Sequence, residues 1–307
     1  MSANQRKSDS PREDMNHSDS AYREIIHDTL QQIDLVHRLV GAYPTHLAHA
    51  YSAADVHREF QSGSRRRISS LLGIEGLHQI GNSVSILRMY YALGVRYATL
   101  THTCHNAYAD SEEPTEPLHH GLSPAGGAMV KEMNRLGMMV DLSHTSFETQ
   151  RAVLQVTAAP VIFSHSNVYS RCKHTRNVPH DVLLALRTNG GVEMITFYAE
   201  FLEKNAETAS LGSVADHIQA VGETIGYRHV GIGSDFDGMQ SGPRGLEDVS
   251  KYPDLIRELQ RRGISIGDIT GIMGTNILRV MEEVENVASS MRHVQPLEDN
   301  VKPFFEY

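Results

Sequence analysis

Six short apolar runs that alternate with amphipathic helical stretches constrain the fold of this chain more than any other sequence feature. The runs cover residues 67–76, 94–102, 137–144, 159–165, 190–198 and 229–236. Helical patterns lie between them, at 83–93, 123–136, 146–156, 182–187 and 214–225, with two more after Tyr252 and two before the first run, at 21–41 and 51–60. Apolar strands separated by helices are typical of a parallel sheet buried on both faces. The pattern predicts an α/β fold of the (β/α)8 TIM-barrel type, of which six strands are found.

Polar side chains that bind metals or move protons end five of these six runs. They are Glu75, His102, His144, His165 and Asp235. In a (β/α) barrel the carboxyl ends of the strands meet at one mouth, where the active site is built. We therefore expect these five side chains to lie together in one site.

The residue types in this set favour metal-assisted hydrolysis. Neutral imidazoles suit Zn²⁺, and one carboxylate can place an oxygen on each of two cations. We expect Glu75 to be this bridge and His144 and His165 to complete the ligands of one ion, which keeps an open position for a water. Asp235 then takes the proton of that water. Asp237, which falls further into the loop, is the alternative.

Charge and hydropathy exclude several other classes of protein. The chain has 28 basic and 37 acidic residues and a net charge of -9, which gives no basic surface for a nucleic-acid backbone. No apolar run approaches the roughly 18 residues of a membrane span, and residues 1–20 lack the apolar core of a signal peptide. These features predict a cytoplasmic protein that binds neither nucleic acid nor a membrane.

Other catalytic motifs are absent or incomplete. The segment GIGSDFDG lacks the third glycine of a dinucleotide fingerprint, and the sequence contains no Walker A motif and no GxSxG elbow. Cys104 lies near His102 and His105, but a thiol nucleophile would leave the other strand-end groups unexplained. The remaining histidines are expected at the surface or around the site, among them His78, His119, His120 and His174.

The composition along the chain predicts three parts. Residues 1–20 are polar without apolar periodicity, which predicts a mobile tail. Residues 21–287 are expected to form the hydrolase barrel, and residues 288–307 a C-terminal extension. The acidic, irregular stretch from Tyr108 to Gly121 is either a lid or an ordinary surface loop.

Six sequence segments carry a resemblance to a known family. They are LLGIEGLHQIGNS, GVRYATLTHTCHNAYADS, GLSPAGGAMVKEMNRLGMMVDLSHTS, APVIFSHSNVYSRCKHTRNVP, GIGSDFDG and GLEDVSKYPDLIRELQRRG. Together they resemble the renal, or membrane, dipeptidase family, which consists of dinuclear zinc enzymes of the amidohydrolase superfamily. The resemblance extends from about residue 21 to about residue 287.

The resemblance implies a role for each candidate residue. Glu75 would bridge two zinc ions, and His144 and His165 would hold one of them. His102 would contact the scissile carbonyl oxygen of the substrate, and Asp235 would transfer the proton of the attacking water. Arg176, assisted by Tyr198, would bind the C-terminal carboxylate of the substrate. A guanidinium suits a free carboxylate because it donates two parallel hydrogen bonds. From the residues alone, Arg176 would be read as a surface salt bridge.

The implied function is hydrolysis of dipeptides by a zinc-bound hydroxide. The substrates include Cys-Gly-type conjugates left after glutathione processing, as in fungal pathways to sulfur-containing secondary metabolites. The alternative function is that of a catalytically silent, truncated family member with a binding role or none. The family also suggests a homodimer.

Two departures from the family involve cysteines and the chain end. Cys104 and Cys172 match two family cysteines, but Val40 stands where one disulfide partner is expected. No hydrophobic tail follows Pro303, whereas secreted members carry a lipid-anchor signal there. Both departures favour a reduced, intracellular protein without a membrane anchor.

A third departure concerns the second zinc ion. The family holds this ion with a His-x-Asp pair at the end of its first strand. The only such pair here is His17-Ser18-Asp19, which no apolar run precedes and for which helix capping is the expected role. Six strands of a barrel would also leave two sheet edges open. We therefore expect a barrel that is incomplete at the N-terminus and a second zinc site without its His-x-Asp ligands.

Overall fold

A computed structural model of the chain describes residues 19–63 and 66–299. The strands are β1 (Leu47–His49), β2 (Ile68–Ser70), β3 (Leu72–Glu75), β4 (Val95–Thr99), β5 (Met139–Asp141), β6 (Ile162–Ser166), β7 (Val192–Ile195) and β8 (Val230–Ile232). The α-helices are α1 (Asp19–Ala42), α2 (Ala53–Gln61), α3 (Val84–Ala92), α4 (Pro124–Leu136), α5 (Phe147–Val156), α6 (His180–Asn189), α7 (Ala199–Leu202), α8 (Leu211–Ile225), α9 (Tyr252–Arg261), α10 (Ile266–Thr270) and α11 (Asn276–Ser290).

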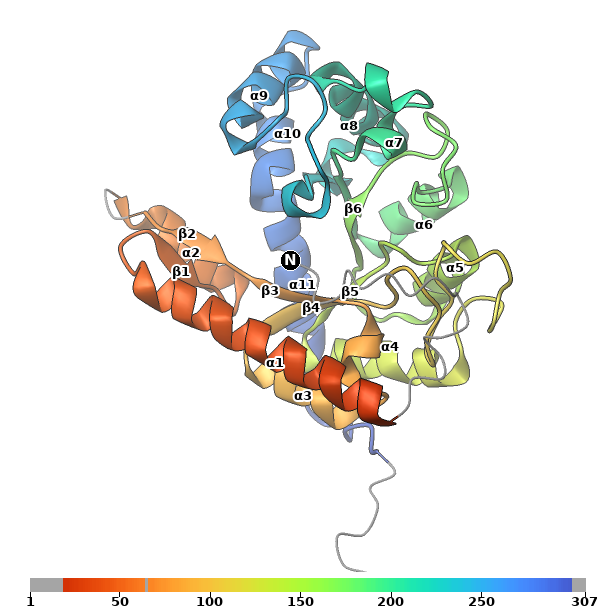
Figure 1. Ribbon diagram of the computed structural model, residues 1–307. Helices are drawn as coiled ribbons and strands as arrows, with labels where there is room; N and C mark the ends of the chain where they lie inside the picture. The colour runs from red at the N-terminus through yellow and green to blue at the C-terminus, as the bar shows by residue number, and fades with distance from the viewer. Residues whose placement is uncertain (1–18, 64–65, 300–307) are drawn as a thin grey trace, which may run out of the picture.

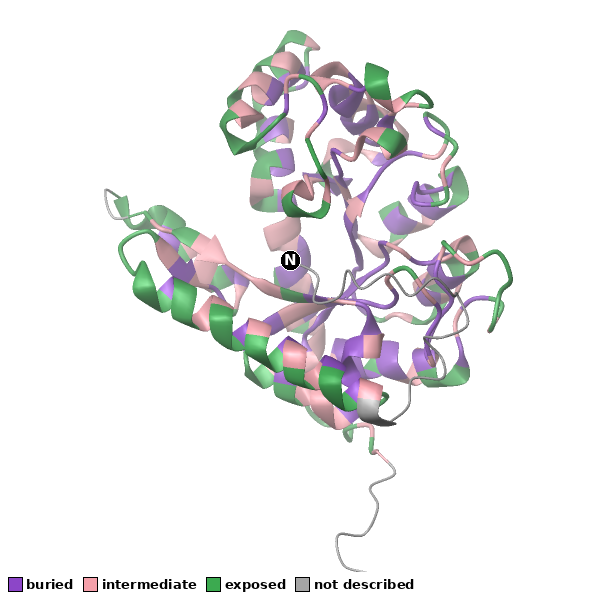
Figure 2. Ribbon diagram, in the orientation of Figure 1, coloured by how far each residue is buried: buried purple, intermediate pink, exposed green. Residues whose placement is uncertain are grey.

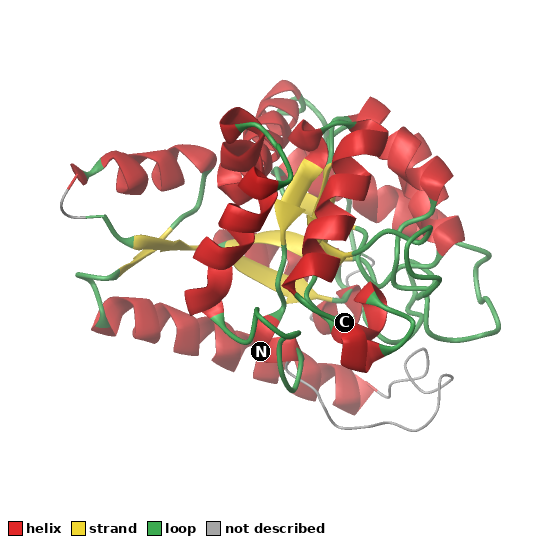
Figure 3. Cartoon of the chain, turned by 90° about the horizontal axis from the view of Figure 1, so that it is seen from above, coloured by secondary structure: helices red, strands yellow, loops and turns green. Residues whose placement is uncertain are grey.

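The six predicted runs contribute to one parallel sheet, which confirms the α/β class. Its strand order is β3-β4-β5-β6-β7-β8, and each strand pairs with the next in parallel. Strands in sequential order with intervening helices are the arrangement of a (β/α) barrel. Among the described residues β3 and β8 do not pair, so the sheet is open between them. Figure 3 shows the strands near the centre of the molecule with helices around them.

The first predicted run, residues 67–76, is two strands rather than one. β2 ends at Ser70 and pairs with β1, whereas β3 begins at Leu72 and pairs with β4. Strand β1 was not predicted, because a three-residue strand has too little apolar periodicity to be recognised. Together α1, β1, β2 and α2 form an arm that stands out to one side of the molecule (Figures 1 and 3).

The helices begin and end where local sequence signals place them. In α4 the Ser123 hydroxyl accepts a hydrogen bond from the N–H of Gly126, Pro124 occupies the first turn, and Gly137 follows the last residue with a φ of 86°. These are the preferred residues at helix starts and left-handed helix ends. Ser146 caps α5 in the same way. Both helices therefore start at fixed points just after loops at the carboxyl ends of the strands.

The region after Tyr252 contains three α-helices instead of the two expected. A π-helical turn, Gly271–Thr275, joins α10 to α11, and Gly274 inside it has a non-helical conformation. The chain therefore has a kink at Gly274 without a break between the two helical segments.

The two faces of the sheet pack against different partners. Met139, Ile162 and Val192 contact α11 through Val280, Met281 and Val284, and we call this side the α11 face. The opposite side, the outer face, includes Val140, Phe163 and Ile195 and packs on apolar residues of α4, α6 and α8. Successive strand residues alternate between the faces. Figure 2 shows the strands of the sheet as mainly buried.

The C-terminal segment is bound to the rest of the chain. α11 continues to Ser290, so the predicted boundary at residue 287 falls inside a helix. Beyond it, the Asp299 carboxylate accepts hydrogen bonds from the N–H groups of Val84 and Ser85 at the start of α3. Arg88 also donates to the carbonyl of Leu297. This part of the predicted extension packs on α3.

The predicted mobile tail lies almost entirely outside the described residues. His17 is among those not described, and Asp19 is the first residue of α1. In the part of the chain that is described, no helix is long and apolar enough to cross a membrane.

Candidate metal centre

The five predicted strand-end residues lie at the carboxyl ends of the sheet. Glu75 is the last residue of β3, and His165 is inside β6. His102, His144 and Asp235 follow β4, β5 and β8 by three residues each, so they lie in turns rather than at the last strand positions. His144 and Asp235 have positive φ angles, 65° and 63°. Such angles are uncommon outside glycine and concentrate at functional sites.

Three of these side chains converge on one point. Oε1 of Glu75 is 3.3 Å from Nε2 of His144 and 3.3 Å from Nε2 of His165, and the two Nε2 atoms are 2.9 Å apart. A tetrahedral ion with bonds of about 2.0–2.1 Å places its ligand atoms about 3.3–3.4 Å apart. The donor set and its spacing therefore fit a zinc-type ion.

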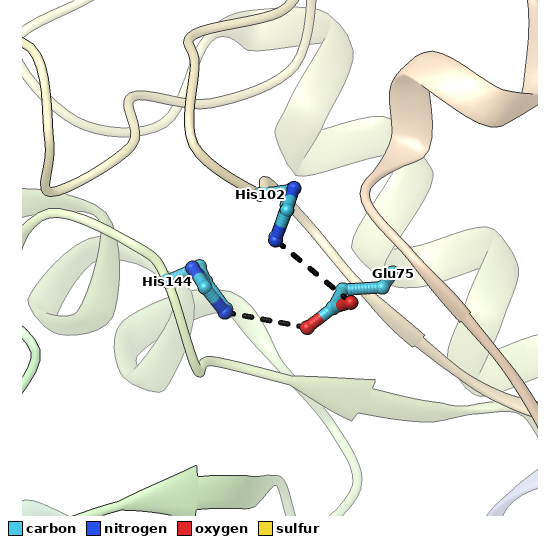
Figure 4. A group of neighbouring side chains, drawn as sticks. All are labelled: Glu75, His102 and His144. Atoms are coloured by element: carbon cyan, nitrogen blue, oxygen red, sulfur yellow. Dashed lines mark ion pairs between the residues drawn. The ribbon is translucent and has the colours of Figure 1, made fainter. Parts of the chain in front are cut away.

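His102 approaches the other oxygen of the same carboxylate. Its Nε2 is 3.8 Å from Oε2 of Glu75, and ligand atoms of Glu75, His102 and His144 all lie within 4.8 Å of one another. Figure 4 shows both imidazoles pointing at the carboxylate, His144 at one oxygen and His102 at the other. The structure thus brings the side chains of His102, His144 and His165 together around Glu75.

The electrostatic surroundings favour the charged form of the Glu75 carboxylate and the neutral forms of His102 and His144. Burial by itself would raise the pKa of Glu75, but hydrogen bonds to His144 and His165 outweigh it and hold the pKa far below its usual range. Burial lowers the pKa of His102, and burial together with the charge of Arg176 lowers that of His144 well below the usual value. Neutral imidazole and ionised carboxylate are the forms that bind metal ions.

A buried network behind the site orients the ring of His165. Nδ1 of His165 is 2.8 Å from the Ser164 hydroxyl, which donates to the carboxylate of Asp141. Asp141 also accepts hydrogen bonds from the Thr99 hydroxyl and from the N–H groups of Ser143 and Ser164. Partners of this kind fix the orientation of a metal-binding histidine. Sequence reasoning missed Asp141, although an aspartate inside an apolar strand is an available signal.

Arg176 is buried beside this cluster. It is 5% exposed, its Nη2 donates to the carbonyl of His165 at 3.1 Å, and its guanidinium lies over the ring of Phe201. Its Nε and Nη1 have no hydrogen-bond partner among the described residues. The surface salt bridge considered from sequence is wrong, because the guanidinium is buried. The nearest carboxylate, that of Glu112, is 3.6 Å from Nε.

Asp235 and Tyr198 complete the predicted set. Burial raises the pKa of Asp235, which favours a group that can both accept and return a proton. Asp237, the alternative, is exposed. Tyr198 directly follows two buried residues and stacks on Phe201 with ring centroids 4.5 Å apart.

These residues line a cavity of about 1240 Å³. Its wall includes Glu75, His102, His144, Arg176, Tyr198 and Asp235. Residues 110–115 of the acidic loop also form part of the wall, so this loop is more than ordinary surface. The loop folds back because the Asp110 carboxylate accepts hydrogen bonds from the N–H groups of Leu118, His119 and Gly121. Of the four histidines expected around the site or at the surface, His120 and His174 line the cavity.

The fold and this cluster define a metal-dependent hydrolase with its site at the mouth of a parallel sheet. A family model described as membrane dipeptidase, peptidase family M19, matches residues 13–295. The chain belongs to this family of dipeptidases, which are metallopeptidases, and the resemblance found in the sequence is confirmed.

Individual relatives agree with this assignment. The chain is 64% identical over 284 residues to dipeptidase aclJ of Aspergillus oryzae, a match that covers 92% of this chain and 67% of the relative. It is 53% identical over 272 residues to dipeptidase verJ of Clonostachys rogersoniana, covering 89% and 69%. The probable dipeptidase PvdM of Pseudomonas aeruginosa, at 23% identity, shares the fold with a TM-score of 0.81 over 89% of this chain and 83% of that protein. The chain thus spans about two thirds of the length of these fungal relatives.

Proposed function

We propose that this protein hydrolyses dipeptides with a zinc ion held by Glu75, His144 and His165. The observation that supports this most directly is the mutual 2.9–3.3 Å spacing of these three ligand atoms, two of which belong to residues in the wall of the cavity, Glu75 and His144, together with the buried Arg176. A zinc ion bound there would lower the pKa of a water toward 7 and polarise a carbonyl. Substrate orientation and proton transfer would be carried out by side chains of the protein.

In the proposed reaction Arg176 and Tyr198 orient the substrate by its C-terminal carboxylate. His102 donates a hydrogen bond to the scissile carbonyl oxygen, which becomes more negative as water attacks. Asp235 takes a proton from the attacking water and delivers it to the nitrogen of the peptide bond. The C–O bond forms as the C–N bond breaks, so the products are two amino acids and no proton is gained or lost by Asp235.

The substrate class is proposed more narrowly as Cys-Gly-type conjugates from glutathione processing. A cavity of about 1240 Å³ has room for a dipeptide whose sulfur carries a further group. In the described part of the chain, ligand atoms of Glu75, His102 and His144 lie within 4.8 Å of one another, and Nε2 of His165 is 3.3 Å from Oε1 of the same carboxylate. We therefore place the proposed ion on the Oε1 side, between Glu75, His144 and His165. The barrel unit of residues 21–287, a cytoplasmic location and a homodimer remain predictions.

The metal site is tested with Glu75→Ala, His144→Ala and His165→Ala, and with His180→Ala, an exposed histidine at the start of α6, as the matched control. We expect the three site variants to lose bound zinc by elemental analysis and to lose dipeptide cleavage, whereas the control keeps both. Unchanged metal content in all three variants would overturn the assignment.

The carboxylate clamp is tested on the substrate side. A dipeptide and the same dipeptide with a C-terminal amide differ only in the group that Arg176 is proposed to bind. We expect the amide to be a much poorer substrate for the natural protein, and this preference to disappear in Arg176→Lys, because an ammonium cannot donate two parallel hydrogen bonds. Zinc binding without cleavage of any dipeptide would favour the catalytically silent alternative.

A further inference from the structure

The carboxylate of Glu112 lies between two residues of the proposed site that come from different loops. Its Oε1 is 3.6 Å from Nε of Arg176 and 3.9 Å from Nδ1 of His144, and its side chain is 7% exposed. We propose that Glu112 is a positioning residue that fixes the His144 ring and the Arg176 guanidinium relative to each other. Through it, metal binding is coupled to recognition of the substrate carboxylate. This inference rests on the proposed function.

The main chain of Glu112 is fixed relative to His144. Its N–H donates to the carbonyl of His144 at 3.1 Å, and the Thr101 hydroxyl donates to the same carbonyl at 2.9 Å. The preceding residue, Ser111, forms an antiparallel bridge with Thr145. These contacts hold the turn in which His144 has its positive φ angle.

The other end of the carboxylate is fixed relative to Arg176. Oε2 of Glu112 accepts a hydrogen bond of 2.8 Å from the hydroxyl of Thr175, the residue before Arg176. Glu112 therefore joins the loop after β5 to the loop after β6: Oε1 faces His144 and Arg176, and Oε2 binds Thr175.

Two buried nitrogen atoms face Oε1 without a hydrogen-bond partner. They are Nδ1 of His144 and Nε of Arg176. A buried donor left unsatisfied reduces stability, and a movement of less than 1 Å would bring both within hydrogen-bond distance of the carboxylate. The geometry thus provides one acceptor for two donors that have no other partner in the described residues.

This acceptor would determine the tautomer of His144. When Nε2 binds a metal ion, the proton is on Nδ1, and a carboxylate that accepts it fixes the ring and makes Nε2 a better ligand. The same carboxylate occupies Nε of Arg176, while Nη2 donates to His165. Nη1 and the second N–H of Nη2 are then the donors of Arg176 that remain for the substrate carboxylate, so two parallel hydrogen bonds are still possible.

The test compares Glu112→Gln with Glu116→Gln. Both remove one negative charge from the acidic loop, and glutamine at 112 can still accept from Thr175, but Glu116 is exposed and is not among the described residues that line the cavity. Zinc affinity is measured by competition with a chromophoric chelator. Dipeptide binding is measured by calorimetry on the metal-free protein and by KM and kcat on the zinc enzyme.

We expect Glu112→Gln to weaken zinc binding by about 10–100-fold and to weaken dipeptide binding and raise KM, with the melting temperature of the metal-free protein little changed. Glu116→Gln should match the natural protein in all of these. A Glu112→Gln variant that changes only one of the two affinities, or only the melting temperature, would overturn the coupling.

Two further outcomes are distinguishable. If the natural protein binds zinc but cleaves no dipeptide, the proposed function fails, while the two binding measurements still decide the role of Glu112. If Glu112→Gln does not fold, Glu112→Asp keeps the charge but shortens the side chain. Zinc and dipeptide affinities equal to those of the natural protein in that variant would overturn the proposal.

Discussion

Two acidic side chains are completely buried on opposite faces of the same sheet, and they differ in the hydrogen-bond donors around them. Asp141 in β5 lies on the α11 face and accepts hydrogen bonds from two hydroxyls and two backbone N–H groups. Glu193 in β7 lies on the outer face, and neither of its oxygens has a hydrogen-bond partner among the described residues. Burial raises the pKa of Glu193 well above its usual value.

The difference shows where this protein provides donors for a buried charge. Asp141 is satisfied because it supports Ser164 and, through it, the ring of His165 at the candidate metal centre. Glu193 pairs in register with Phe163 and Val230 and supports no such group. A buried acid without donors reduces stability. Asp141 therefore supports the candidate metal centre, whereas burial of Glu193 lowers the stability of the fold.

The largest effect is expected for Asp141→Asn. The substitution removes the charge and replaces one acceptor oxygen by an NH2 group that faces other donors. Because hydrogen bonds to charged groups contribute about 1.5–3 kcal/mol each, we expect a loss of about 3 kcal/mol of unfolding free energy, with weaker zinc binding. Urea unfolding and chelator competition measure both. A loss below about 1 kcal/mol would show that the network matters little.

The second effect has the opposite sign. Glu193→Leu replaces an unpartnered buried carboxyl by an apolar side chain of similar size, so we expect the free energy of unfolding at pH 7 to rise by about 1–3 kcal/mol. Zinc binding should not change, because the outer face does not contact the site. A destabilised variant would mean that Glu193 has a partner that the structure does not reveal.

The third prediction concerns the pH range in which burial of the Glu193 carboxyl group reduces stability. The folded pKa of Glu193 lies above its ordinary value of 4.5. A raised folded pKa means that the contribution of the group to stability is complete below about pH 4.5 and is lost as pH rises through the folded pKa. The melting temperature of Glu193→Gln relative to the natural protein should therefore increase from pH 4 to pH 8. A constant difference would contradict this assignment.

The smallest effect is expected for Ser164→Ala. It removes one hydrogen bond to Asp141 and the contact with Nδ1 of His165, which should cost about 1 kcal/mol of stability and about tenfold in zinc affinity. Ser166→Ala is the control, since its hydroxyl approaches only Ser143. Equal zinc affinities in the two variants would indicate that the Ser164 hydroxyl does not orient His165.

Much of the fold and of the metal centre was predictable because the signals are local. Strand-length apolar runs and the residues that end them placed Glu75, His144 and His165 at one edge of a parallel sheet. The division of residues 67–76 into β2 and β3 was not predictable, because it depends on pairing of β2 with β1. Glu112 lies in a loop without periodicity, and its two partners come from other loops.

Asp141 and Glu193 show a further limit. Each is a single acid inside an apolar run, in the segments MMVDLSH and GGVEMITFY. The two acids differ in the face of the sheet on which they lie. On the face of Asp141, β4, β6 and the turn after β5 provide hydrogen-bond donors. A sequence pattern detects a buried acid, but the neighbouring strands decide its role.

The position of Glu75 has a consequence for how long an ion would stay bound. Glu75 ends β3, an edge strand that pairs only with β4 in the described sheet, whereas His144 follows β5 and His165 lies in β6. Edge elements open more readily than central ones. The residence time of the ion would then be governed by the opening rate of β3, and a bound ion would slow amide hydrogen exchange in this strand by joining it to β5 and β6.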